Sequence, residues 1–396
     1  MKNLYKTGLV ALLIALLAGA AQAETVTIQA RYQPDQADFI DINPPGRLCL
    51  QWPSHCKNVW RSFSVDLPIE FSKPVLGQPM TQPAPRDMYY INMPGPTQAF
   101  ITHDRTGERE EVTLEFVAWE MGVYSADPNR HPVNGSHPEG GHCGTLTIPP
   151  AGTYKVNGWW VMSQGPCYTS GGLPGGVWGD TQTNNMAAIV RVRTPNPHRM
   201  KHGMWRGNLS FTVGDGAQID LGNGAQVSRG QQVDFNFELE VVHSFVIDFP
   251  PNSDKAVLQP DGGWERYWRG GPVPRRLFNE VPFRLWSSGP FKVYIECQRN
   301  MGTMCGLMHR PTAHQVPFSV ALTLPPEHTH LGAPVLGQVL PVGQANALEF
   351  DSNATTWDRR GTLKYEVSGS DVIDEMLANP GATYSGLVWI IFDAEL

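Results

Sequence analysis

The sequence predicts an all-β protein made of two β-sandwich domains in tandem. It contains 40 Gly and 34 Pro among 396 residues, and both residue types interrupt helices. Hydrophobic residues make up 41% of the chain and charged residues 17%, so there is enough apolar side chain to bury a core. The length exceeds what one compact core usually serves, which indicates two domains. The net charge of −7 argues against a general nucleic-acid-binding protein.

The first 23 residues have the features of a secretory signal peptide. Lys2 and Lys6 give a basic start, the run Leu9–Ala18 is apolar, and Ala21–Ala23 fits a small-residue cleavage site. The apolar run is shorter than the roughly 20 residues that a membrane-spanning helix needs. We therefore expect an exported chain whose mature part begins at Glu24.

Strict alternation of apolar and polar residues predicts the strands. From Val233 to Val241 the odd-numbered residues are apolar and the even-numbered ones polar, as in a strand with one buried face. Turn residues separate such runs at short intervals, which is typical of immunoglobulin-like sandwiches. The one expected helix runs from Ser370 to Ala378. The same alternation recurs at Val112–Ala118, Leu209–Val213, Phe291–Cys297, Phe318–Leu324 and Leu363–Val367.

A short polar break at Gly214–Gly216 predicts the domain boundary, because a strand ends at Val213 and a new apolar run begins at Ile219. We expect a first domain over residues 24–214 and a second over residues 217–396. The second carries most of the acidity: residues 24–216 have a net charge of −2, and residues 217–396 a net charge of −7.

Six cysteines in an exported chain are expected to form disulfides. Sequence alone allows many pairings, and we expect the local one because each bridge then closes a short loop within one domain. The chain contains no C-x-x-C pair, and we expect His142, His328 and His330 to be loop histidines rather than zinc ligands. The predicted bridges are Cys49–Cys56, Cys143–Cys167 and Cys297–Cys305.

The C-terminal segment is apolar on both faces when read as a strand. An exposed apolar edge is an aggregation hazard, so this strand is either an ordinary core strand between two neighbours or an edge that another polypeptide covers. One face carries Tyr384, Gly386, Val388, Ile390 and Phe392, and the other carries Leu387, Trp389 and Ile391.

These residues resemble those of a known family. The run Tyr384–Val388, preceded by Asn379–Gly381, resembles the last strand of chaperone-usher pilus subunits. The segment Val241–Cys297, with Phe249-Pro250-Pro251 and Ser288-Gly289-Pro290-Phe291, is similar to the pilin-type domain of CblD-like minor pilins. These are the tip adhesins and initiators of cable pili and class 5 fimbriae. The loop Leu48–Cys56 resembles the first cysteine loop of their adhesin domain.

The resemblance implies a fimbrial tip subunit that initiates pilus assembly. Its first domain would be an adhesin domain that binds a host glycan or glycoprotein. Its second would be an incomplete pilin-type domain, completed by a donor strand that enters a groove formed by the face from Tyr384 to Phe392. The implied partners are a periplasmic chaperone, an outer-membrane usher and the major pilin. The implied location is the tip of a cell-surface fimbria, reached through the periplasm.

The mature N-terminus, Val26–Tyr32, also alternates and could be either a donor strand or the first adhesin strand. A tip subunit has no subunit ahead of it that could receive a donor strand. We therefore expect this segment to be the first strand of the adhesin domain.

An acid-free stretch suggests where the first domain binds its receptor. Between Asp180 and Asp215 lie 34 residues without an acid but with five Lys or Arg residues. Arginine suits the carboxylate of an acidic sugar or a sulfate, so Arg191, Arg193, Arg199 and Lys201 form the predicted receptor site. The alternatives are a solvated basic face, or a sugar-stacking platform made by Trp159, Trp160 and Trp178.

A secreted β-sandwich lectin or polysaccharide-active enzyme is the alternative function. The chain has no G-x-S-x-G, H-E-x-x-H or G-x-x-x-x-G-K-[ST] motif, so we expect neither catalysis nor a cofactor or metal. Glu108, Glu110, Glu111 and Glu115 could supply the carboxylate pair of a glycosidase. They flank a turn at Thr106-Gly107, and a solvated hairpin rim is the expected arrangement.

Overall fold

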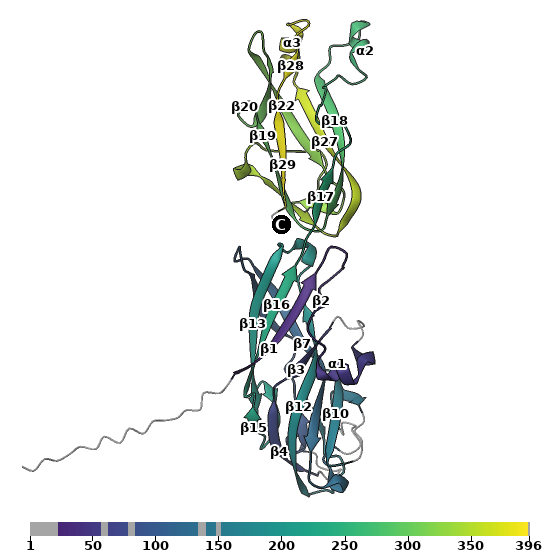
Figure 1. Ribbon diagram of the computed structural model, residues 1–396, viewed down its shortest axis with the longest axis vertical. Coiled ribbons are helices and arrows are strands. Elements are labelled where there is room, and N and C mark those ends of the chain that lie inside the picture. Colours follow the sequence, from purple (N-terminus) through teal and green to yellow (C-terminus); the bar gives the residue numbers. More distant parts are fainter. Residues whose placement is uncertain (1–22, 57–61, 78–83, 134–139, 148–151, 395–396) are drawn as a thin grey trace, which may run out of the picture.

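The computed structural model describes residues 23–56, 62–77, 84–133, 140–147 and 152–394. Two β-rich bodies follow one another along the long axis of the molecule (Figure 1). Of the described residues, 54% lie in strands and 9% in helices, which confirms the predicted all-β tandem sandwich. Within the described residues, no helix combines the length and apolarity needed to cross a membrane. The predicted signal peptide lies outside the described residues, apart from Ala23.

The first body is built around a 13-stranded sheet with the main path β15-β4-β12-β7-β6-β13-β16-β1-β2. Strands β3, β9, β10 and β14 pair off this path, and β5, β11 and β8 form a smaller sheet. The strands are β1 Ala23–Tyr32, β2 Ile40–Asp41, β3 Ser62–Leu67, β4 Glu70–Leu76, β5 Tyr89–Ile91, β6 Thr97–His103, β7 Arg109–Tyr124, β8 Gly140–Gly141, β9 Cys143–Thr147, β10 Tyr154–Val161, β11 Cys167–Thr169, β12 Trp178–Arg193, β13 Gly203–Gly214, β14 Ile219–Asp220, β15 Gln226–Arg229 and β16 Gln232–Val241. Its helical turns are α1 Arg47–Gln51, η1 Pro53–His55, η2 Pro85–Asp87, η3 Pro128–Arg130 and η4 Pro197–Arg199.

The second body contains two sheets. One has the order β17-β18-β27-β22-β21-β20, with β25 and β28 attached, and the other has the order β24-β23-β26-β19-β29. The strands are β17 Phe245–Asp248, β18 Arg276–Ser287, β19 Phe291–Cys297, β20 Asn300–Met301, β21 Met304–His309, β22 His314–Thr323, β23 His328–His330, β24 Ala333–Pro334, β25 Gln338–Val339, β26 Leu348–Ser352, β27 Thr356–Ser368, β28 Tyr384–Ser385 and β29 Val388–Asp393. Its helical elements are α2 Trp264–Trp268, η5 Gln344–Asn346 and α3 Ser370–Leu377, the last of which is the predicted helix.

Strand β1 lies in the first sheet, as expected for the segment Val26–Tyr32 of a tip subunit. It runs parallel to β16, from Ala23 opposite Gln232 to Tyr32 opposite Val241. Its inward side chains Val26, Ile28, Ala30 and Tyr32 are buried in the first core. The mature N-terminus is therefore an internal strand of the first domain.

The two hydrophobic cores divide the chain at a different place from the one that the sequence suggested. Strand β16 pairs with β13 and β1, and its alternating apolar residues lie in the first core. The second core begins with the partly buried Phe245. The expected boundary at residues 214–217 thus falls inside the first sheet, and we propose that the domains divide between Val241 and Phe245. The reason is that an alternating sequence shows that one face of a strand is buried, but it does not show in which of the two cores that face lies.

The polar break at Gly214–Gly216, which the sequence suggested as the domain boundary, is bound to the first domain by hydrogen bonds and ion pairs. Lys73 on β4 is buried, and its Nζ donates hydrogen bonds to the carbonyl oxygens of Arg86, Leu221 and Asn223 at 2.8, 2.9 and 3.0 Å. Burial lowers the pKa of Lys73 to about 8. Arg86 also forms ion pairs with Asp215 and Asp220. These contacts bind the Gly214–Gly224 segment to β4 and η2.

The structure contains the three predicted disulfides, Cys49–Cys56, Cys143–Cys167 and Cys297–Cys305. None crosses between the two bodies. Cys143 and Cys167 are buried in the first core, and Cys305 in the second. The cysteines thus close local loops within each domain, as expected.

The position of β16 predicts how fragments of this chain behave. A fragment of residues 24–243 should fold, whereas one of residues 24–216 should not, because it lacks the buried face of β16. Each lost apolar side chain contributes about 1.5–3 kcal/mol, and five of them together match the roughly 5–15 kcal/mol stability of a domain. Near-ultraviolet circular dichroism and amide hydrogen exchange measure the outcome. A folded 24–216 fragment would contradict the assignment of β16.

Candidate functional site

The last strand of the chain, β29, is the edge of its sheet. It pairs antiparallel with β19, from Val388 opposite Cys297 to Asp393 opposite Lys292. No described strand pairs with its other side. The backbone N–H and C=O groups on that side are therefore open to another polypeptide. Figure 1 marks the C-terminal end of the chain between the two bodies.

A second sheet edge lies close to β29. Strand β17 ends the other sheet and pairs only with β18 among the described strands. The rings of Phe245 on β17 and Phe392 on β29 have centroids 6.2 Å apart, and both contact Phe291. The Phe283 ring from β18 lies 5.9 Å from Phe392. The edge strands of the two sheets, β17 and β29, therefore both reach this aromatic cluster. No described strand of the chain lies between them.

The apolar side chains along these edges are only half-buried. Val388, Ile390 and Phe392 pack against the second core without being fully covered, as do Phe245 and Ile247. In the first domain nearly all core side chains are fully buried. An unpaired backbone edge beside a row of half-covered apolar side chains is suited to bind an extended strand with alternating apolar residues.

The outer face of β29 differs from its inner face. Leu387 and Trp389 are 58% and 53% exposed, whereas the residues between and beyond them contact the core. The two predicted faces of this segment therefore exist, but only one of them faces the sandwich.

The structure does not place all five predicted groove residues on this edge. Tyr384 lies on β28, which pairs with β21 in the other sheet, and its hydroxyl is 2.8 Å from Nδ1 of His314. A Cβ at Gly386 would lie 2.7 Å from the carbonyl oxygen of Gly306, so this position is pressed against β21. The chain changes sheets between β28 and β29. Val388, Ile390 and Phe392 are the predicted residues that lie along the open edge.

The four predicted receptor-binding residues lie in two separate places. Arg191 and Arg193 project from the same face of β12, as their spacing predicted, and both form ion pairs with Glu115 on β7 at 3.2 and 3.0 Å. The Arg193 side chain is 63% exposed, and that of Arg191 is 28% exposed. This pair is a surface feature whose charge Glu115 offsets in part.

Arg199 and Lys201 lie at the junction of the two domains. Arg199 donates a hydrogen bond to Oδ1 of Asn353 in the second domain, and Lys201 forms an ion pair with Glu108 at 3.3 Å. Both line a small pocket between the domains, together with His202, His243, Lys292, Glu349, Asp351 and Asp393. Arg199 therefore contributes to the contact between the domains, whereas Lys201 pairs within the first domain and lines the pocket beside it.

Histidines form a buried part of the same junction. The Tyr32 hydroxyl and the Ser288 carbonyl oxygen lie 2.8 and 3.4 Å from Nδ1 of His198. His243 donates from Nε2 to the carbonyl oxygen of Met200 at 2.7 Å, and Ser244 donates its N–H to the Ser288 hydroxyl at 2.9 Å. Burial lowers the pKa of His243 to about 4 and also lowers that of His198. The sequence contained no pattern that would have shown this cluster.

The tryptophan platform is only partly present. Trp159 is fully buried and its ring lies 6.3 Å from that of Trp119. Trp160 is half-buried and packs against a small cluster that includes Leu48. Trp178 is 57% exposed, so it is the one of the three predicted tryptophans with a largely accessible ring.

The predicted acidic residues lie on strand and turn surfaces. Glu108 pairs with Lys201, Glu111 accepts a hydrogen bond from Gln98, and Glu115 pairs with the two arginines of β12. This is the solvated hairpin rim that the sequence suggested. The three carboxylates have protein partners rather than facing each other across a cleft.

No family model matches the chain, and no curated protein matches it in sequence. Its neighbours among solved structures are chaperone-usher tip adhesins, at low identity and low TM-score. A chaperone–tip adhesin complex of CFA/I fimbriae shares 9% identity, with 94% of this chain and 96% of that chain covered and a TM-score of 0.25. The tip subunit complex of the archaic Csu pili of Acinetobacter baumannii shares 8%, with 94% and 99% covered and a TM-score of 0.22. The CupB6 tip adhesin from Pseudomonas aeruginosa shares 8%, with 83% and 96% covered and a TM-score of 0.18.

Acid should weaken the junction because its histidines are buried in the neutral form. An unfolded histidine has a pKa near 6.5, whereas that of His243 in the folded chain is about 4. The unfolded state therefore binds more protons between these values. The neutral form of His243 therefore makes its full contribution to the free energy of unfolding above about pH 6.5. This contribution, up to about 3 kcal/mol, is lost as the pH falls toward 4.

Urea unfolding of the whole chain between pH 4 and 7 measures this loss. His243→Gln should make stability less dependent on pH, while His142→Gln, at an exposed position, should leave the dependence as in the wild type. Equal pH dependence of wild type and His243→Gln would contradict the prediction.

Proposed function

We propose that this chain is the tip subunit of a chaperone-usher pilus. The open edge of β29, with its half-buried apolar row, carries the proposal. A periplasmic chaperone would cover this edge first, and a donor strand of the major pilin would replace it at the outer-membrane usher. The first domain would attach the pilus to a host-cell glycan or glycoprotein. The chain would act at the tip of a cell-surface fimbria that it reaches through the periplasm.

Covering the edge supplies two kinds of stabilisation at once. An added strand forms backbone hydrogen bonds with β29, and its apolar side chains bury those of Val388, Ile390 and Phe392. Each square ångström of apolar surface removed from water contributes about 25 cal/mol. A chaperone and a pilin could each supply such a strand, which supports the sequential exchange.

The pairing of β1 with β16 in its own domain supports a position of this chain at the end of the pilus. In a linear polymer joined by strand exchange, each subunit accepts one strand and donates another. Here the first described strand is buried in its own domain, alongside β16. A chain that accepts a strand while its first described strand stays in its own domain is suited to begin a polymer. This supports the role of pilus initiator.

The alternative, a secreted lectin or polysaccharide-active enzyme, finds less support. Such a protein would need a complete sandwich to act as a soluble monomer, and the second domain has an uncovered edge. The three predicted acidic residues with described contacts are held by Lys201, Gln98 and the β12 arginines. We therefore propose a binding protein without catalysis.

Adding a strand should stabilise the second domain. A peptide of alternating apolar residues, joined to the C-terminus by a flexible linker, should raise its melting temperature by about 10 °C or more, as a gain of a few kcal/mol implies for a domain of this size. Ile390→Asp should abolish this gain and capture by the chaperone, because it would bury an unpaired charge. Differential scanning calorimetry and co-purification with the chaperone measure the two effects.

Trp389→Asp is the matched control. It places the same charge on the same strand, but on the exposed outer face, and should leave both the stabilisation and the capture in place. An unmodified chain that is monomeric, melts cooperatively and gains nothing from the added strand would show that strand completion does not occur.

Receptor binding through Arg191 and Arg193 is a separate proposal. If these residues bind an acidic glycan, the double variant Arg191→Ala/Arg193→Ala should lower adhesion to epithelial cells by at least one decade while pili still assemble. Each charge-assisted hydrogen bond contributes roughly 1.5–3 kcal/mol. Added salt should weaken attachment in the same way. Arg206→Ala, on β13, serves as the control, and adhesion that neither the double variant nor salt changes would exclude this site.

A further inference from the structure

A pocket of about 580 Å³ opens on the side of the first domain. Its lining includes Ile40 and Asp41 of β2 and the disulfide-bonded Cys49 and Cys56. Ser64 of β3 and Ile189 of β12 also line it. Its volume is in the range of pockets that hold small ligands, about 300–1,000 Å³.

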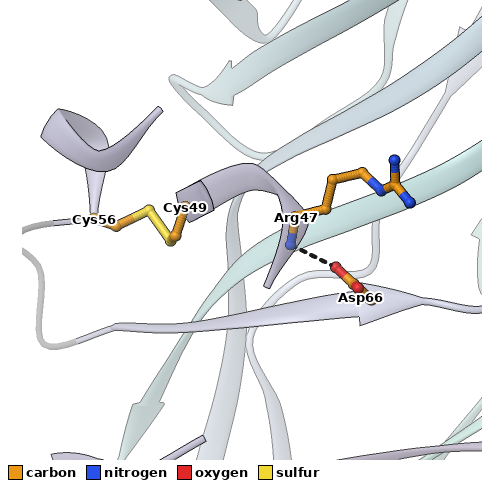
Figure 2. The surroundings of a disulfide bond; sticks show 4 residues. All are labelled: Arg47, Cys49, Cys56 and Asp66. Carbon is orange, nitrogen blue, oxygen red and sulfur yellow. Dashed lines mark hydrogen bonds between the residues drawn. A yellow bond between two sulfur atoms is a disulfide. The ribbon is translucent and has the colours of Figure 1, made fainter. Parts of the chain in front are cut away.

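The wall made by the disulfide segment is fixed in place. Figure 2 shows Cys49 of α1 joined to Cys56, and the backbone N–H of Arg47 directed at Asp66 on β3. That hydrogen bond measures 2.8 Å. Leu48 is fully buried in a small cluster with Ala187 and Ile189, which anchors α1 on β12. The described part of this wall is therefore held in place before a ligand binds.

Two residues that line this pocket each carry a buried polar group without a hydrogen-bond partner among the described residues. These groups are the hydroxyl of Ser64, a residue only 7% exposed, and Nδ2 of Asn43. A buried polar group without a partner is uncommon in folded proteins and requires an explanation. Oδ1 of Asn43 accepts the N–H of Gln29 at 2.9 Å, so the amide is oriented with its donor free.

The remaining lining residues suit a sugar. Asp41, at the exposed end of β2, presents a carboxylate that accepts hydrogen bonds, and it is oriented by the N–H of Asn43 at 2.8 Å. Phe39 and Ile40 add apolar surface at the same wall. Donors, acceptors and apolar surface are thus brought together, as the hydroxyl groups and C–H face of a pyranose ring require.

We propose that this pocket binds an uncharged hexose unit of a glycan. Nδ2 of Asn43 donates to a sugar oxygen, Asp41 accepts from a sugar hydroxyl, and Ser64 Oγ both donates and accepts. None of the described lining residues is Lys, Arg or His, and Asp38 and Asp41 both line the pocket. A carboxylate or sulfate would meet only like charge here. The ligand class therefore differs from the acidic glycan that Arg191 and Arg193 would bind.

Ser64→Ala gives a sharp test, because removing a buried hydroxyl without a partner leaves folding stability unchanged or raised. The full mature chain is titrated with the methyl glycosides of glucose, galactose and mannose, with sialyllactose as the acidic comparison, and binding is followed by saturation-transfer NMR. We expect at least one hexoside to bind, and Ser64→Ala to weaken it roughly three- to tenfold. Asn43→Asp keeps the acceptor for Gln29 and removes the donor, and should also weaken binding. Ser210→Ala, at an exposed serine of β13, should have no effect.

Three results would overturn the inference: no hexoside binds, the bound hexoside is retained by both variants, or sialyllactose alone binds and is lost in the Arg191→Ala/Arg193→Ala variant. A fall in stability of Ser64→Ala would show that the hydroxyl has a structural role instead. The inference rests on the proposal that the first domain binds the receptor. Strand completion of the second domain is measured separately by melting, so either proposal can fail alone.

Discussion

The unpaired edge of β29 is the constraint on which the second domain depends. An edge strand presents backbone groups that need partners, and here the same strand presents Val388, Ile390 and Phe392 only half-covered. The nearest other edge, β17, approaches at Phe245 without forming a ladder with β29. A polypeptide that adds a strand here satisfies the backbone and completes the core together. In the proposed function, a partner strand would therefore contribute to the stability of the domain and to assembly at the same time.

In the first domain, a strand of the chain itself pairs with the edge of β16. Strand β1 has the alternating pattern of an inserted strand, and it lies parallel to β16 with Ile28, Ala30 and Tyr32 fully buried. One domain is therefore complete while the other has an open edge. This asymmetry distinguishes the two domains at β16, which has two described neighbours, and β29, which has one. It also explains why nearly all core residues of the first domain are fully covered, whereas many in the second are not.

Between the domains, polar groups are largely satisfied by one another. His198 of the first domain contacts Tyr32 of the same domain and Ser288 of the second, and Arg199 donates to Asn353. Buried polar groups with partners on both sides fix an orientation better than apolar contact does, because each hydrogen bond depends on direction. Arg199, which the sequence suggested as a receptor residue, therefore helps to join the domains.

Local properties are what the sequence by itself determined. Alternation and turn residues predicted the all-β class, and the spacing of the cysteines predicted their pairing. The apolar C-terminal segment predicted either a core strand or an edge that another polypeptide covers. Tertiary structure decided which sheet each strand enters. Alternation in Val233–Val241 shows a buried face, but only pairing with β13 and β1 places it in the first core. In the same way, Arg193 and Arg199 lie six residues apart in the chain yet have Glu115 and Asn353 as partners, because the partner of a charge is set by strands distant in sequence.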